Sequence, residues 1–177
     1  MKDYLLLFLI SLLPVALSAL VYLTGRTKAA EKISYANRQI IIGVLFGVLA
    51  IIGTEFGIKI DGAVINARDA SPVCAGLLFG APAGIIAGVI GGVERWLAVF
   101  WGAGEYTRLA CSISTVLAGV FAAVLRKYMF DNKKPKWYYC LATAVIAEVI
   151  HMLMIFLTNM TDARTAFSFV RACSLPM

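Results

Sequence analysis

Five apolar stretches follow one another along the chain, and their lengths constrain the fold more than any other feature. They cover residues 4–24, 39–57, 70–103, 109–126 and 138–158. Four of them are long enough, at 1.5 Å per helical residue, to cross a hydrocarbon layer of about 30 Å. A soluble domain could not bury so much apolar surface, because 61% of the 177 residues are hydrophobic and only 15% are charged. We therefore predict an all-α, polytopic membrane bundle of five to six membrane helices.

The first stretch could also be a cleaved signal peptide. Its apolar run from Tyr4 to Leu23 is longer than the roughly 7–15 residues of a signal-peptide core. We interpret it as a retained membrane helix, in which Pro14 is tolerated.

The basic residues indicate the topology. Nine of the sixteen lysines and arginines fall in the two short loops 25–38 and 126–137. The positive-inside rule assigns both loops to the cytoplasm. They can share a side only if the stretch 70–103 enters the membrane and returns. This distribution also excludes nucleic acid as a partner, since binding it needs basic residues clustered on a solvated face.

The stretch 70–103 therefore predicts a helical hairpin broken by glycine and proline at residues 80–84. Its arms, 70–80 and 83–100, would be about 16 and about 27 Å long at helical rise. The short arm cannot span the membrane, so we expect it to lie against protein or a wet cavity. Glycines recur every fourth residue from Gly76 to Gly92, a spacing that favours close packing of helices.

Arg68, Asp69 and Arg95 form the most informative polar group, because ionisable residues in a membrane are costly and usually functional. The predicted topology places all three toward the outer side. Asp69 or Ser71 can cap the next helix, with Pro72 in its first turn. The positive end of that helix favours an anion beside Arg68.

The helix that begins near Leu109 carries Cys111 and Ser114 on one face, three residues apart. Arginine binds carboxylates with two parallel hydrogen bonds, and a hydroxyl and a thiol can bind a second oxygen. The residues predict a pocket for a small organic anion, open to the outside. The alternative is that the two arginines snorkel to the interface or pair with Asp69 and Glu94.

Two further groups are interpreted more simply. Glu148 and His151 lie three residues apart in the fifth stretch, a spacing that can bind metal, but an interhelical hydrogen bond is favoured because His151 is the single histidine. The cysteines show no CxxC spacing and are interpreted as free thiols: Cys74, Cys111, Cys140 and Cys173. We predict neither a metal nor a cofactor.

Three segments carry a resemblance to a known family: GAVINARDASP, GLLFGAPAGIIAGVIGGVERWL and ACSISTVLAGV. Together they closely resemble the transmembrane sensor region of LytS-type histidine kinases, the five-transmembrane receptors. The resemblance implies a bacterial plasma-membrane receptor that detects a small extracellular carboxylate such as pyruvate. It implies a signal to a cytoplasmic histidine kinase or diguanylate cyclase, a response regulator as partner, and a homodimer. The ligand contacts it implies are Asn66, Arg68, Arg95, Cys111 and Ser114, supported by Asp69, Ser71 and Glu94.

The chain departs from the family pattern at two places beside this pocket. Glu94 stands where members often carry histidine, and the stretch 96–109 is several residues longer, with an additional Arg108. Ligand identity therefore stays open. The chain ends where the family begins its last helix. We expect a single sensor domain over 1–177, cut before that helix, with no output domain and no enzymatic activity of its own.

Two other functions fit the same residues. A small-solute transporter, or a subunit like the S components of vitamin-uptake systems, would also use glycine-broken half-helices around a binding site. A structural subunit would bind no ligand. Flux across a membrane distinguishes the transporter, and indifference to small carboxylates distinguishes the structural subunit.

Overall fold

The computed structural model describes the chain except residues 1, 26, 28–31, 61–62, 103 and 175–177. Its helices and strands are α1 Lys2–Thr24, α3 Tyr35–Glu55, β1 Ile58–Ile60, β2 Ala63–Ile65, α4 Ala70–Leu78, α5 Ala81–Leu97, α6 Arg108–Tyr128, α7 Trp137–Thr158 and α8 Ala163–Ser174. Short 3-10 turns follow α5 at Ala98–Trp101 and precede α8 at Met160–Asp162. Part of the basic loop 25–38, and the side chain of Cys173, lie outside the described residues.

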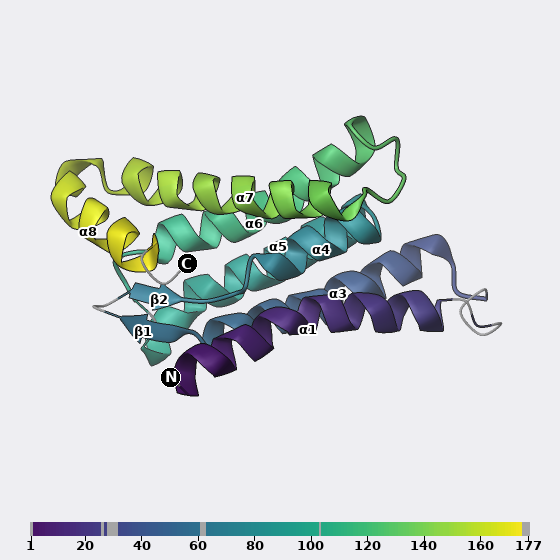
Figure 1. The fold of residues 1–177 in the computed structure, drawn as a ribbon, viewed down its shortest axis with the longest axis horizontal. Coiled ribbons are helices and arrows are strands. Elements are labelled where there is room, and N and C mark those ends of the chain that lie inside the picture. The colour runs from purple at the N-terminus through teal and green to yellow at the C-terminus, as the bar shows by residue number, and fades with distance from the viewer. Residues whose placement is uncertain (1, 26, 28–31, 61–62, 103, 175–177) are drawn as a thin grey trace.

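Five helices within the described residues are long and apolar enough to cross a membrane: α1, α3, α5 with its 3-10 turn, α6 and α7. They run roughly side by side along the long axis of the molecule (Figure 1). The predicted all-α membrane bundle is confirmed. Pro14 lies inside α1, which continues through it.

The predicted helical hairpin is formed by α4 and α5, and it is confirmed. The chain reverses at Gly80, whose φ of +144° is accessible to glycine at little cost. The loops after α1 and after α6 lie at the same end of the bundle (Figure 1), where the Lys134 ammonium lies 4.0 Å from the centre of the Tyr22 ring. We call this the basic end and the opposite one, with β1 and β2, the strand end. Which side of the membrane each end faces stays a prediction.

The short arm reaches deeper than its nine residues suggest. Gln39, in the first turns of α3 at the basic end, donates from Nε2 to the carbonyl of Phe79 at 2.9 Å. The tip extends this far because residues 66–69 enter the bundle from the strand end as non-helical chain, before α4 begins. Irregular backbone is tolerated at membrane depth only where protein surrounds it. Arg68 and Asp69 are accordingly buried.

Glycines allow α5 to lie against α4 and α6. A Cβ added to Gly84 would come within 2.5 Å of the Gly76 Cα, and one added to Gly88 would come within 3.0 Å of the Thr115 carbonyl oxygen. The first contact is too close for any side chain, and the second is tighter than most Cβ contacts in proteins. The predicted small-residue packing of the hairpin is therefore confirmed, and it places the last turns of α5 beside α6.

Two elements at the strand end differ from expectation. The antiparallel pair β1–β2, with Ile58 opposite Ile65, was not predicted, since each strand has only three residues. The second is α8, which begins at Ala163, although the chain was expected to end before its last helix. Its Ala166 is buried in a cluster with Ala110 and Ile155.

Candidate ligand site

Arg68 and Asp69 form a buried ion pair at the start of α4. The Arg68 side chain is fully buried, and its Nε donates to Asp69 Oδ1 at 3.3 Å and to the Thr115 hydroxyl of α6 at 2.6 Å. The Thr115 hydroxyl donates in turn to Asp69 Oδ1 at 2.6 Å. Such a pair is tolerable inside a protein only when further hydrogen bonds support it, and here the Thr115 hydroxyl contacts both members.

His151 extends this network to α7 and back to α6. Its Nδ1 lies 2.7 Å from Asp69 Oδ2, and its Nε2 lies 3.2 Å from the Cys111 sulfur. The interhelical hydrogen bond predicted for His151 is therefore confirmed. Asp69 is at the N-cap position of α4, but the expectation that its side chain caps the helix is wrong, because the carboxylate faces the network instead.

Arg95, in the last turn of α5, is also fully buried. One terminal nitrogen donates to the Gly104 carbonyl at 2.7 Å and to the Thr107 hydroxyl at 3.2 Å. Within the described residues, its Nε and its other terminal nitrogen have no hydrogen-bond partner. The group lies close enough to Arg68 and Cys111 to interact with both electrostatically. A guanidinium carries five N–H donors, so Arg95 retains an unmet demand for acceptors.

The alternative that both arginines pair with neighbouring carboxylates applies to one of them. Arg68 pairs with Asp69. Arg95 makes no ion pair in the part of the chain that the structure describes, although Glu94 precedes it in sequence. Both Glu94 carboxylate oxygens are buried and have no partner there either. Glu94 and Arg95 therefore do not satisfy each other.

The remaining predicted residues fall into two groups. Asn66 shapes the approach to the site: its Oδ1 accepts from the Arg68 backbone N–H at 3.2 Å and its Nδ2 donates to the Val64 carbonyl at 3.2 Å. Ser71 is buried in α4, with no partner for its hydroxyl among the described residues. Ser114 lines a separate groove of about 270 Å³ between α6 and α7. The structure thus brings Arg68, Asp69 and Cys111 together, with Arg95 beside them, and gives the Ser114 hydroxyl no partner among the described residues.

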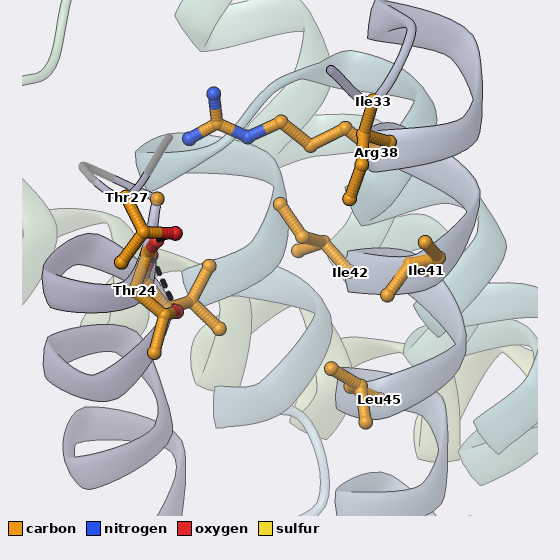
Figure 2. A pocket seen from close by; sticks show the side chains of 9 residues that line it. Thr24, Thr27, Ile33, Arg38, Ile41, Ile42 and Leu45 are labelled. Atoms are coloured by element: carbon orange, nitrogen blue, oxygen red, sulfur yellow. Dashed lines mark hydrogen bonds between the residues drawn. The ribbon is translucent and has the colours of Figure 1, made fainter. Parts of the chain in front are cut away.

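A larger open cavity lies elsewhere, at the basic end between α1 and α3 (Figure 2). Its volume is about 300 Å³, and its walls are largely apolar, including Val21 of α1 and Ile41 and Leu45 of α3. Arg38 extends from α3 toward the end of α1. A Cβ added to Gly25 would lie 2.8 Å from a terminal nitrogen of Arg38. Neither Arg68 nor Arg95 lines it, so this cavity is not the predicted anion site.

The chain is similar to a known family of membrane sensor domains. The model of the family described as 5TMR of 5TMR-LYT matches residues 21–177. The chain belongs to this family. Its membrane sensor domain resembles that of the sensor histidine kinase YpdA of Escherichia coli K12, which is 25% identical over 148 residues, covering 83% of this chain and 25% of YpdA. The sensor histidine kinase BtsS of the same organism is 30% identical over 116 residues, covering 63% of this chain and 20% of BtsS.

The 5TMR chain thus spans about a quarter or less of the length of these curated relatives. No solved structure matches it. The family match confirms the resemblance drawn from the sequence segments around Arg68, Arg95 and Cys111. It covers all the membrane helices from α3 onward and the end of α1.

Sequence reasoning missed Thr115, and it predicted an interhelical hydrogen bond for His151 without assigning that residue to the site. Thr115 contacts both members of the ion pair, and His151 joins Asp69 to Cys111. Both had a signal. Thr115 lies four residues after Cys111, which is as close on a helix as the three-residue spacing of Ser114. His151 is a polar residue in the middle of an apolar membrane helix, a placement that usually marks function.

Proposed function

We propose that this 5TMR domain binds a small carboxylate of the pyruvate type at Arg95, near the strand end of the bundle. The observation that carries the proposal is the state of Arg95: fully buried, cationic, and with two guanidinium nitrogens lacking protein partners among the described residues. A buried cation without compensation costs several kcal/mol or more. A carboxylate would supply both the charge and two acceptors in the fork geometry that guanidinium matches.

Arg68 also has donors that such a ligand would engage. Its Nε is engaged by Asp69 and Thr115, but its two terminal nitrogens make only long contacts of 3.5 Å, to the Thr54 hydroxyl and the Cys111 carbonyl. Normal N–H···O bonds are about 2.7–3.2 Å long. A ligand oxygen between the two arginines would therefore improve the hydrogen bonding of both.

The names of the relatives suggest how this domain could transmit the binding of a ligand. YpdA and BtsS are named sensor histidine kinases, so we propose that this domain passes its state to a cytoplasmic kinase or diguanylate cyclase. A response regulator and a second copy of the chain would be its partners. Differential binding alone can drive such a signal, provided the ligand favours one of two arrangements of the helices.

Calorimetric titration of the purified domain in detergent tests the proposal. Pyruvate should bind saturably to the parent chain and not measurably to Arg95→Ala, while acetamide, which has no charge, should not bind to either. Heat of binding that is the same in the Arg95→Ala variant would contradict the assignment of Arg95.

Transport stays the alternative, because the broken hairpin α4–α5 is also the kind of element on which transporters bind solutes. Uptake of labelled pyruvate into proteoliposomes decides between the two. The receptor proposal expects no accumulation above protein-free vesicles, and accumulation would favour the transporter.

A further inference from the structure

Cys111, His151 and Asp69 form a chain of three polar groups from three different helices. The Cys111 sulfur lies 3.2 Å from His151 Nε2, and His151 Nδ1 lies 2.7 Å from Asp69 Oδ2. This is the order of nucleophile, base and orienting carboxylate by which proteins activate cysteine and serine.

The carboxylate determines which ring nitrogen carries the proton. Asp69 is ion-paired with Arg68 and accepts from Thr115, so it acts as an acceptor. In the neutral imidazole, Nδ1 must then be the donor to Asp69, which leaves the lone pair of Nε2 directed at Cys111. His151 is thereby prepared to take the thiol proton.

Two cations next to the sulfur favour negative charge on it. The guanidinium groups of Arg68 and Arg95 both lie close enough to Cys111 to interact with it electrostatically. Arg95 also provides an independent indication of a ligand, because it is fully buried and two of its nitrogens have no partner in the described chain. The nucleophile and the unsatisfied cation therefore occupy one site.

These neighbours select a ligand by its chemistry. A carboxylate would satisfy Arg95, and a nucleophilic Cys111 can react with an electrophilic carbon next to that carboxylate. A 2-oxo acid is the smallest molecule that carries both. Building on the proposed carboxylate site, we infer that Cys111 adds reversibly to the keto carbon of a 2-oxo acid bound at Arg95, with His151 moving the proton.

The step is balanced without a further reactant. His151 Nε2 takes the thiol proton, and the sulfur electron pair forms a carbon–sulfur bond at C2 of the acid. The π-electron pair of the carbonyl moves to its oxygen, which receives the proton from His151. The product is a thiohemiketal, nothing is oxidised or reduced, and reversal releases the ligand. Hydroxy acids and simple carboxylates cannot react, so the bond would distinguish a 2-oxo acid from its reduced form.

Carbon-13 NMR of the purified domain in detergent tests the inference directly. Pyruvate labelled at C2 should give a bound tetrahedral-carbon resonance that is separate from that of the hydrate of the free acid, with the carbonyl signal of the free acid depleted to match. The parent chain should also bind pyruvate at least about tenfold more tightly than lactate by calorimetry. In Cys111→Ala the tetrahedral signal should vanish and the two acids should bind alike. Cys140→Ala, which removes a different free thiol, should behave as the parent chain.

The outcomes separate the two proposals. Saturable pyruvate binding whose C2 remains a carbonyl carbon, with no preference over lactate, overturns the covalent step and leaves the carboxylate site intact. It would mean that Cys111 and His151 only link α6 and α7. If neither acid binds to the parent chain, the carboxylate site fails and the covalent step fails with it. The measurements on the parent chain decide this even if a variant does not fold.

Discussion

Arg68 and Arg95 are both withdrawn from solvent, yet their guanidinium groups have different surroundings. Arg68 lies where α3, α4 and α6 meet, with an ion-pair partner and a hydroxyl within hydrogen-bond distance. Arg95 lies where α5 turns toward α6, and its described partners, Gly104 and Thr107, engage only one of its nitrogens. One arginine has a charged partner in the protein, and the other has none among the described residues.

This difference between Arg68 and Arg95 predicts that one affects the stability of the fold and the other the affinity for a ligand. A cation that is paired inside the protein is part of what stabilises the fold, because removing its partner leaves an unpaired buried charge. A buried cation without enough acceptors raises the free energy of the empty site. A ligand that supplies those acceptors removes this cost, and the difference adds to the binding free energy. We therefore expect the Arg68 region to control unfolding and the Arg95 region to control affinity.

Removing Asp69 should produce the largest loss of stability. Asp69→Ala leaves Arg68 and His151 without their carboxylate, and breaking a buried pair typically costs about 3–5 kcal/mol. Reversible unfolding in detergent measures it. Glu105→Ala, which removes an exposed carboxylate at the same end, should change the unfolding free energy little. Equal losses in the two variants would remove the distinction between the regions.

Replacing Arg95 should affect binding more than folding. Arg95→Lys keeps the charge and much of the stem but loses the planar fork, so carboxylate affinity should fall. Arg95→Ala should lose about 2–5 kcal/mol of pyruvate binding free energy. Calorimetry measures both. Arg108 is a matched control, because it is a nearby arginine stacked 4.1 Å above the Trp96 ring, and Arg108→Ala should retain the parent affinity.

A change in the hairpin away from both arginines should affect the whole fold. Gly84→Ala places a methyl group against the Gly76 backbone, and overpacking of this kind costs about 1–3 kcal/mol. Ile85→Ala, at the neighbouring and 40% exposed position, should cost less. Thermal unfolding of the two variants compares them. A larger loss for Ile85→Ala would mean that the close packing of α4 on α5 is not what stabilises the hairpin.

The fold could be predicted because short segments of the sequence determine most of it. Helix length follows from apolar runs, and the return of the hairpin follows from basic residues in two loops. The depth of α4 could not be predicted in this way. It depends on residues 66–69 entering the bundle as non-helical chain, and the Asn66 side chain helps to shape that segment. The strand pair β1–β2 is too short to give a period-two pattern.

The site was predictable in part for a similar reason. Arg68, Asp69 and Arg95 are conspicuous in any membrane sequence because they are ionisable. Their partners depend on how α6 and α7 are rotated about their axes, which the spacing of residues does not determine. Positions three and four residues after Cys111 are equally close to it on a helix. The three-residue choice, Ser114, lies in the α6–α7 groove, while Thr115 makes the contacts.

Substitutions of Thr115 and Ser114 give the smallest expected effects. Comparing them tests how α6 is rotated about its axis. Thr115→Val keeps the shape but removes the hydroxyl between Arg68 and Asp69, so the unfolding free energy should fall by about 1 kcal/mol or somewhat more. Ser114→Ala removes a buried hydroxyl without a described partner and should change neither stability nor pyruvate affinity by more than about 0.5 kcal/mol. Unfolding and calorimetry on both variants measure the contrast. If Ser114→Ala instead abolished binding while Thr115→Val had no effect, α6 would present its other face to the ligand, and the network at Arg68 would need to be redrawn.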